Sequence, residues 1–277
     1  MRKAFVVGHP IAHSRSPLIH GYWLQNLHIE GSYVRIDILP EDFDAFVHGV
    51  AESGFAGGNV TIPHKEAAYR LVDRLTPRAQ KIGAVNTLVV SEDGILGDNT
   101  DAPGFVAHVD QTLGNDWLRR CGGTVLILGA GGAARAIVAG LAERGVDRIL
   151  IANRSQDRAR SLIEIEPERI EVIEWSTVPQ ALLETGLLVN TTSLGMIGHA
   201  PLDISLDALP ATAAVADIVY APLETTLLKT ARARGLATVD GLGMLLHQAV
   251  PGFEAWFGTR PQVTPELRDL VVADLSR

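Results

Sequence analysis

The stretch at residues 124–135, which reads T-V-L-I-L-G-A-G-G-A-A-R, constrains the fold of this chain most strongly. Residues 125–128 form an unbroken apolar run, which is typical of a strand covered on both faces in a parallel sheet. Gly129, Gly131 and Ala134 complete a G-x-G-x-x-A pattern, and a segment of helical composition follows. A strand, a glycine turn and a helix in this order predict a dinucleotide-binding unit.

Each small residue of this pattern has a physical role. Gly129 permits the tight turn, Gly131 lets a pyrophosphate approach the backbone, and Ala134 lets the helix pack closely on the strand. The free N–H groups and the positive dipole end of the helix would hold the phosphates. The alternative is an ordinary turn with glycines for geometry alone. The residues expected to bind the cofactor here are Gly129, Ala130, Gly131, Gly132 and Ala133.

The composition restricts the class of protein. The 277 residues allow one large domain or two modest ones. The net charge of −8 argues against a general nucleic-acid surface. The single cysteine, Cys121, fits a reducing compartment, and neither a signal peptide nor a run of ~18 apolar residues is apparent. We therefore expect a soluble cytoplasmic protein without nucleic-acid or membrane partners.

The first hundred residues predict an α/β unit with its own mostly parallel sheet. The expected strands lie at residues 4–7, 32–38, 83–90 and 95–97, and the expected helices begin at residue 17, span residues 41–50 and begin again at residue 63. Residues 55–62 contain a glycine pair and the run N-V-T-I. In the strand at 32–38 the alternation places Val34, Ile36 and Ile38 toward the core and Tyr33 on the opposite face.

The later part of the chain alternates strands and helices, which predicts a doubly wound, Rossmann-type parallel sheet. The expected strands lie at residues 124–128, 148–152, 187–190, 215–219 and 237–239. A helix at 244–257, kinked at Pro251, and a last helix ending at 275 follow. We predict two domains with a cleft between them: a substrate domain of residues 1–103 and 241–277, and a nucleotide domain of residues 104–240.

The end of the second strand of the nucleotide unit indicates which dinucleotide is bound. NAD-binding proteins usually place an acidic residue here, but this chain has Asn153, followed by Arg154 and Arg158. Two guanidinium groups can pair with a 2′-phosphate by hydrogen bonds worth about 1.5–3 kcal/mol each. The pattern favours NADP over NAD. The alternative is that Arg154, Arg158 and Arg160 belong to a solvated helix start.

Five blocks of the sequence resemble, in the same order, the motifs of one enzyme family. They are residues 8–17 (G-H-P-I-A-H-S-R-S-P), 59–65 (N-V-T-I-P-H-K), 86–87 with 97–101 (N-T and G-D-N-T-D), 153–158 (N-R-S-Q-D-R) and 241–248 (G-L-G-M-L-L-H-Q). On these blocks, which extend along nearly the whole chain, the protein resembles the shikimate dehydrogenase family. Gly21, Pro77 and Thr226 depart from residues that are common in that family.

The resemblance implies a role for each matching position. Ser14 and Ser16 would bind the substrate carboxylate, although Ser16 could instead be a helix N-cap. The implied substrate-binding residues are Ser14, Ser16, Thr61, Lys65, Asn86, Asp101, Tyr220 and Gln248. The implied cofactor-binding residues beyond the glycine turn are Asn153, Arg154, Ser155 and Arg158, with Ile218 and Gly241 near the nicotinamide.

Lys65 and Asp101 are the pair that we expect to transfer a proton. A cationic lysine can donate to a carbonyl oxygen and stabilise the developing alkoxide. We therefore expect Lys65 to act as the acid in ketone reduction and as the base in alcohol oxidation, oriented by Asp101. The alternative is a surface ion pair, worth ~0–1 kcal/mol.

The resemblance implies an NADP-dependent reduction of 3-dehydroshikimate to shikimate, on the route to chorismate and the aromatic amino acids. One alternative is a quinate/shikimate dehydrogenase that tolerates NAD, and another is a non-catalytic NADP-sensing module. The histidines show no H-x-x-x-H or H-E-x-x-H spacing, so we expect no metal. We expect a small-molecule substrate and either a monomer or a homodimer.

Overall fold

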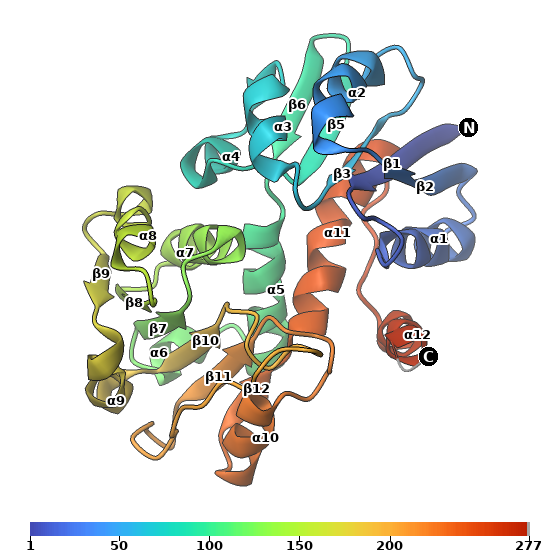
Figure 1. Cartoon of the computed structure of the whole chain (residues 1–277). Helices are drawn as coiled ribbons and strands as arrows, with labels where there is room; N and C mark the ends of the chain where they lie inside the picture. The colour runs from blue at the N-terminus through green and yellow to red at the C-terminus, as the bar shows by residue number, and fades with distance from the viewer. Residues whose placement is uncertain (276–277) are drawn as a thin grey trace. The chain divides into compact units, whose positions relative to one another are not determined.

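The computed structural model describes residues 1–275 and separates into two compact α/β units (Figure 1). The first unit comprises Met1–Asp101 and Leu246–Arg277, and the second comprises Ala102–Leu245. Helices α5 (Asp101–Leu113) and α11 (Gly241–Phe257) each contain one of the boundaries. The predicted fold class, two α/β units with parallel-rich sheets, is confirmed.

The second unit contains a six-stranded, fully parallel sheet in the order β12-β11-β10-β7-β8-β9. When β7 is numbered as strand 1 and the sheet is read from the β9 edge, the order is 3-2-1-4-5-6, which is the strand order of a Rossmann fold. The strands are β7 (Thr124–Leu128), β8 (Arg148–Ala152), β9 (Ile170–Ile173), β10 (Leu187–Asn190), β11 (Ala214–Asp217) and β12 (Ala237–Val239). All were expected from their apolar runs except β9, a short edge strand with one buried, one exposed and two half-buried positions.

The helices of the second unit connect these strands. They are α6 (Trp117–Arg120), α7 (Gly132–Arg144), α8 (Gln156–Arg160), α9 (Val178–Ala181) and α10 (Thr226–Ala233), with short 3-10 turns η2 (Ile163–Ile165), η3 (Trp175–Thr177) and η4 (Leu182–Glu184). The helix expected at 157–165 is therefore two shorter pieces. Leu126, Leu150 and Leu188 are fully or almost fully buried in the core beneath these elements, which explains why their strands read as continuous apolar runs.

The first unit contains a mixed six-stranded sheet in the order β2-β1-β3-β5-β6-β4. Its strands are β1 (Arg2–Gly8), β2 (Gly31–Asp37), β3 (Gly57–Val60), β4 (Arg74–Leu75), β5 (Thr87–Ser91) and β6 (Gly94–Asp98). Strand β5 runs antiparallel to β3 and β6, and the other pairs are parallel. The β3–β5 register places Asn59 opposite Thr87, which brings the polar ends of two buried strands together.

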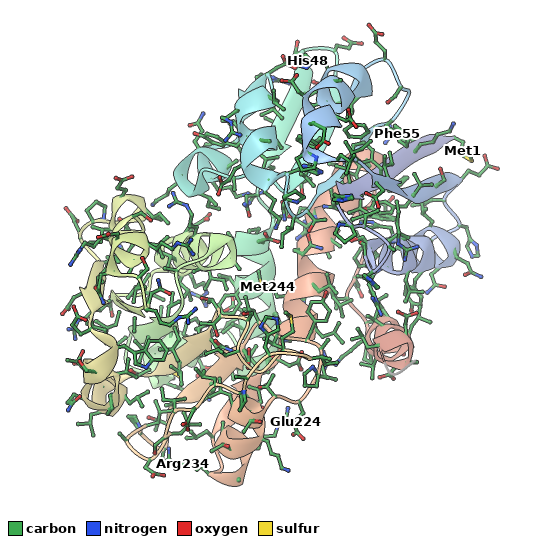
Figure 2. All side chains as sticks on the ribbon, in the orientation of Figure 1. Met1, His48, Phe55, Glu224, Arg234 and Met244 are labelled. Atoms are coloured by element: carbon green, nitrogen blue, oxygen red, sulfur yellow. The ribbon has the colours of Figure 1, made fainter. Side chains whose placement is uncertain are left out.

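The first unit also contains several helices. They are α1 (Ser16–Asn26), α2 (Phe43–Val50) after the turn η1 (Pro40–Asp42), α3 (Lys65–Leu71), α4 (Pro77–Ile82), the later part of α11, and α12 (Pro265–Leu275). Phe5 of β1 lies in one core with Phe43 and Val47 of α2, and Phe55 (labelled in Figure 2) packs edge-on against it at 5.1 Å. Figure 1 shows α12 beside α1, and α12 begins where the Thr264 hydroxyl accepts a hydrogen bond from the Leu267 N–H at 3.3 Å.

The side-chain alternation expected for β2 is wrong at its centre. Tyr33 is 9% exposed and Val34 is 41% exposed, the reverse of the expectation. The ring of Tyr33 stacks on that of His20, with centroids 4.0 Å apart and an interplanar angle of 12°. Its hydroxyl donates to Oδ1 of Asn59 at 2.6 Å. The burial of an aromatic ring whose hydroxyl group is hydrogen-bonded therefore stabilises the fold more than the burial of one valine would.

Helix α11 continues through Pro251 to Phe257. None of the helices within residues 1–275 is long and apolar enough to cross a membrane.

Candidate active site

Lys65 and Asp101 lie together in the first unit. Lys65 is the first residue of α3 and Asp101 is the first residue of α5. The Lys65 Nζ atom lies 2.6 Å from Oδ2 of Asp101, and the two side chains are 31% and 13% exposed. The pair is thus mostly shielded from water, unlike the fully solvated surface ion pair considered from the sequence. A charged donor with two further N–H bonds is available for a ligand.

Asn86 joins this pair from the residue before β5. Its Nδ2 group donates to Oδ1 of Asp101 at 2.9 Å. Its own backbone N–H donates to the carbonyl oxygen of Asp98 at 3.0 Å, so the side chain projects from a fixed point in the sheet. Three residues that the sequence separates by up to 36 positions therefore form one cluster, with Asp101 accepting from both Lys65 and Asn86.

The loop at residues 8–17 presents Ser14 and Ser16. The Ser16 N–H donates to Oγ of Ser14 at 3.3 Å. The guanidinium of Arg35 donates twice to the carbonyl oxygen of Ser14, from Nε at 3.1 Å and from Nη2 at 2.6 Å. Helix α1 begins at Ser16 itself, and its N-cap is Arg15 without a side-chain cap. The alternative reading of Ser16 as an N-cap is therefore wrong.

Thr61 lies beside this loop. Its N–H donates to the carbonyl oxygen of Val7 at 2.9 Å, and the N–H of His9 donates to the carbonyl oxygen of Ile62 at 3.1 Å. Gln248, on α11, is buried in the same unit. Tyr220 belongs to the second unit, so its role in substrate binding remains a prediction.

The glycine turn in the second unit contains one glycine that the protein's own conformation and packing require and two that they do not. Gly129 has φ 107°, and a Cβ there would lie 2.6 Å from Oγ1 of Thr191, so both conformation and space require glycine. A Cβ at Gly131 or Gly132 would meet no other described atom within 4 Å. Packing within the described protein therefore does not explain these two glycines. Open space at the start of the thirteen-residue helix α7 suits a phosphate that approaches the backbone.

The arginines that follow β8 differ in their contacts. Arg160 pairs with Asp157 at 3.0 Å. Within residues 1–275, the guanidinium groups of Arg154 and Arg158 form neither a hydrogen bond nor an ion pair, and both residues are exposed. Asn153 instead donates from Nδ2 to the Ser155 carbonyl oxygen at 2.8 Å, which shapes the turn. Two cations that have no partner among the described residues therefore follow β8, the position at which NADP-binding proteins recognise a 2′-phosphate.

Ile218 and Gly241, the residues expected near a nicotinamide, approach each other closely. A Cβ at Gly241 would overlap the backbone carbonyl of Ile218, so only glycine fits there. Asp240 fixes the start of α11, because its Oδ1 atom accepts from the Leu242 N–H at 3.0 Å. Met244, labelled in Figure 2, lies in the first turns of the same helix.

Three family models match consecutive parts of the chain. Residues 6–88 match the shikimate dehydrogenase substrate binding domain, residues 116–197 match shikimate / quinate 5-dehydrogenase, and residues 241–265 match the shikimate 5'-dehydrogenase C-terminal domain. A protein of Methylobacterium radiotolerans named shikimate dehydrogenase (NADP(+)) is 67% identical over 275 residues, which cover 99% of this chain and 98% of that protein. The chain belongs to the shikimate dehydrogenase family.

Solved structures of family members share the fold over their whole length. A shikimate 5-dehydrogenase from Thermus thermophilus, in complex with NADP(H) and shikimate, is 35% identical with a TM-score of 0.84, over 99% of this chain and all of that one. A quinate dehydrogenase from Corynebacterium glutamicum, in complex with NAD, is 30% identical with a TM-score of 0.90, over 98% of this chain and 99% of that one.

Sequence reasoning did not find a buried carboxylate in this member of the shikimate dehydrogenase family. Asp217, at the end of β11, is almost fully buried and has no cationic partner among the described residues. It accepts from the Thr225 hydroxyl at 2.7 Å, from Nδ2 of Asn190 at 2.9 Å and from the Val219 N–H at 3.0 Å. Burial raises the pKa of Asp217 above its usual value, and these hydrogen bonds partly offset the shift. The carboxylate thus anchors the segment that carries Ile218 and Tyr220.

A second carboxylate holds the segment that leads to Asp101. Burial would raise the pKa of Asp98, but hydrogen bonds from Arg78 and Thr76 outweigh it and hold the pKa below its usual value. Nε of Arg78 lies 2.7 Å and the Thr76 hydroxyl 2.6 Å from Oδ1 of Asp98. Pro77, a departure from the common family residue, occupies the first turn of α4, where proline is favoured.

The buried polar residues to which the sequence analysis gave no individual role share one signal. Each is a polar side chain within or beside a buried strand, where an unpaired polar group would be costly. They are Asn59, Thr87, Thr100, Asn190 and Asp217. Among residues 1–275, no group of three or more His, Cys, Asp or Glu side chains could hold a metal ion.

Proposed function

We propose that the chain catalyses the NADP-dependent, reversible reduction of 3-dehydroshikimate to shikimate, a step toward chorismate and the aromatic amino acids. The observation that carries this proposal is the shielded pair of Lys65 and Asp101 at 2.6 Å, held by Asn86. The full-length relative named shikimate dehydrogenase (NADP(+)) supports the same reaction. In this proposal the first unit binds the substrate and the second binds NADP.

The residues of the second unit fit NADP. The open space at Gly131 and Gly132 would admit the pyrophosphate to the backbone N–H groups that begin α7. Arg154 and Arg158, whose guanidinium groups are free within the described residues, would pair with the 2′-phosphate. Asn153, Ser155, Ala130 and Ala133 would line the same site, and Ile218 and Gly241 would lie at the nicotinamide. Bound NADPH supplies the hydride that reduces the carbonyl carbon.

Lys65 provides the proton in ketone reduction. As the carbon–oxygen π bond breaks, its electron pair moves to the oxygen, and one N–H proton of Lys65 transfers to that oxygen to form the alcohol. Before transfer, the ammonium stabilises the charge that develops on the oxygen. In the direction of alcohol oxidation the same nitrogen receives the proton.

Asp101 keeps the Lys65 nitrogen in position. Its Oδ2 atom accepts one N–H bond of Lys65, which leaves the others for the substrate. Its Oδ1 atom accepts from Asn86, so the carboxylate cannot rotate without breaking both contacts. The remaining lone pairs of Asp101 can accept a substrate hydroxyl.

The other substrate contacts extend the resemblance to the family. Ser14 and Ser16 would bind the carboxylate with their hydroxyl groups, on the loop that Arg35 holds. Thr61, Asn86, Gln248 and Tyr220 would pair with the ring hydroxyls. An unpaired buried polar group costs about 1–3 kcal/mol, so such a set favours a polyol of matching shape.

A second candidate is a dehydrogenase that also accepts quinate or NAD. The neighbour from Corynebacterium glutamicum, named quinate dehydrogenase and solved with NAD, has a TM-score of 0.90 to this chain. Two features argue against NAD as the main cofactor: Asn153 stands in place of an acid, and Arg154 and Arg158 have no partner within residues 1–275. A non-catalytic NADP sensor would have no need of the Lys65–Asp101 pair.

Steady-state turnover of the purified protein tests the proposal. The substrates are shikimate and quinate, each with NADP and with NAD. Turnover that is high only with shikimate and NADP would support the proposed function. Comparable turnover of quinate or with NAD would favour the second candidate, and no turnover with any pair would overturn both in favour of a sensor.

Size-exclusion chromatography with light scattering distinguishes a monomer from a homodimer. We propose the cytoplasm as the location, because the single cysteine fits a reducing compartment.

A further inference from the structure

The amide group of Asn86 is oriented by a donor whose direction cannot change. The backbone N–H of Thr100 donates to Oδ1 of Asn86 at 2.8 Å. A backbone N–H can only donate, so the oxygen of the amide must face Thr100. The NH₂ group must then face Asp101, where it donates to Oδ1 at 2.9 Å. The direction of one backbone bond thereby fixes how the catalytic carboxylate is held.

Two buried hydroxyl groups reinforce this orientation. The Thr87 hydroxyl donates to Oδ1 of Asn86 at 2.9 Å, and the Thr100 hydroxyl lies 3.2 Å from the same oxygen. The side chains of Thr87 and Thr100 are almost completely buried. Up to three donors therefore converge on one amide oxygen. Such convergence polarises the amide and strengthens the hydrogen bond that its NH₂ group donates.

A second amide donates to the Thr87 hydroxyl group and so orients it. Nδ2 of Asn59 donates to the backbone carbonyl oxygen of Asn86 at 3.2 Å and to Oγ1 of Thr87 at 3.3 Å. Because a carbonyl oxygen can only accept, the contact with Asn86 fixes the orientation of this amide, and the Tyr33 hydroxyl donates to Oδ1 of Asn59 at 2.6 Å. Oγ1 of Thr87 therefore accepts from Asn59. Its own proton has two acceptors in reach, Oδ1 of Asn86 at 2.9 Å and Oγ1 of Thr100 at 3.1 Å, of which the amide oxygen is the nearer.

We propose that Thr87 and Thr100 are positioning residues for the reaction, acting on Asp101 and Lys65 through the amide of Asn86. Neither threonine needs to contact the substrate, since each is buried behind Asn86. The chain of donors runs in one direction, from Tyr33 through Asn59 and Thr87 to Asn86. This inference rests on the proposed function, because it assumes that Lys65, held in position by Asp101, transfers the proton.

Removal of the Thr87 hydroxyl tests the proposal. Thr87→Val keeps the volume and Thr87→Ala does not, but both remove the donor. We expect both to lower kcat roughly tenfold, the effect of one lost hydrogen bond, with KM for NADP within about twofold of the wild-type value. Thr100→Val, which keeps its backbone N–H, should lower kcat less. Thr87→Ser restores the hydroxyl and should recover kcat to within about threefold.

A double-mutant cycle separates positioning from a loss of packing. If Thr87 acts through Asn86, Thr87→Val should have less than about a twofold effect on kcat in the Asn86→Ala background. Thr185→Val is the matched control. Thr185 is a fully buried threonine of the second unit whose hydroxyl donates to the Ala181 carbonyl oxygen at 2.8 Å. It should lower the melting temperature without changing kcat.

The outcomes distinguish this inference from the proposed function. If the wild-type protein does not oxidise shikimate, the proposed function fails and the positioning inference falls with it. If the wild type is active but Thr87→Val and Thr87→Ala retain its kcat, only the positioning inference is overturned. Additive losses in the Asn86→Ala background would overturn it too. If Thr87→Val does not fold at 25 °C, Thr87→Ala and Thr100→Val decide the question.

Discussion

The Lys65 ammonium lies 2.6 Å from the Asp101 carboxylate, and each residue begins a helix of the chain, α3 and α5 respectively. Both helix starts are anchored by other residues. The ring of His64, the N-cap of α3, stacks on Phe43 at 4.2 Å and hydrogen-bonds through Nε2 to the Ile38 carbonyl oxygen at 2.8 Å. The geometry of the pair is therefore set by the fold rather than by the two flexible side chains alone.

Lys65→Ala should lower kcat for shikimate oxidation by about two to four powers of ten, the usual contribution of a proton-transfer group. KM should change much less, because the lost interaction acts mainly in the transition state. Steady-state kinetics in both directions measure this. Lys81→Ala, on an exposed face of α4, is the control and should retain wild-type rates. A rise in KM as large as the fall in kcat would contradict a proton-transfer role.

Arg154→Ala should raise KM for NADP by about tenfold or more, since a hydrogen bond to a charged group contributes about 1.5–3 kcal/mol. KM for NAD should hardly change, because NAD lacks the 2′-phosphate. Arg160→Ala is the matched control, as Arg160 already pairs with Asp157 at 3.0 Å. An unchanged ratio of the two KM values in Arg154→Ala would exclude Arg154 as the phosphate clamp.

Arg35→Met should raise KM for shikimate by roughly fivefold to tenfold, because two hydrogen bonds to the Ser14 carbonyl are lost and the loop gains freedom. KM for NADP should stay the same. Arg74→Met is the control, since Arg74 is exposed in the same unit and donates from Nη2 to Oγ of Ser91 at 3.0 Å. Equal kinetics of the two variants would show that Arg35 does not support substrate binding.

The second unit was predictable because its signals are local. The run of apolar residues at 125–128, the glycine turn and the following helix are adjacent in the sequence, and the structure places them in β7 and α7. The ion pair of Lys65 and Asp101 was also expected, but only because the surrounding motifs resemble one family. A lysine and an aspartate separated by 36 positions carry no such information alone.

The polar network behind Asp101 was not predictable, because it depends on the register between strands. Asn59 and Thr87 meet only because β3 and β5 run antiparallel with these two residues opposite each other. Tyr33 was assigned to the wrong face for a similar reason. Its buried position depends on His20 and Asn59, which come from a helix and another strand.

His20 makes the stability of the first unit depend on pH. Its side chain is fully buried and stacks on Tyr33 and Phe253, and neither ring nitrogen has a hydrogen bond of normal geometry within the described residues. Burial lowers the pKa of His20 to about 3, and the nearby Asn59 side chain opposes this shift without cancelling it. The native state therefore keeps the ring neutral, whereas the unfolded chain binds a proton below a pH of about 6.5.

The sign of the effect follows from proton binding. Between about pH 6.5 and 3 the unfolded state binds more protons than the native state, so the free energy of unfolding falls as the pH decreases. From pH 7.5 to pH 5 this single group should remove about 2 kcal/mol of stability. In His20→Leu that contribution is absent, so its free energy of unfolding should fall by about 2 kcal/mol less than that of the wild type over the same range.

Urea denaturation at pH 7.5 and pH 5 measures the difference, and all other titrating groups cancel between the two proteins. Ile19→Ala is the control, because Ile19 is a fully buried neighbour in α1 that does not titrate. This variant should be less stable than the wild type by about 2–5 kcal/mol at both pH values, with the wild-type pH dependence. If His20→Leu lost as much stability on acidification as Ile19→Ala, the ring would be protonated in the native state, and its burial among aromatic rings would not keep it neutral.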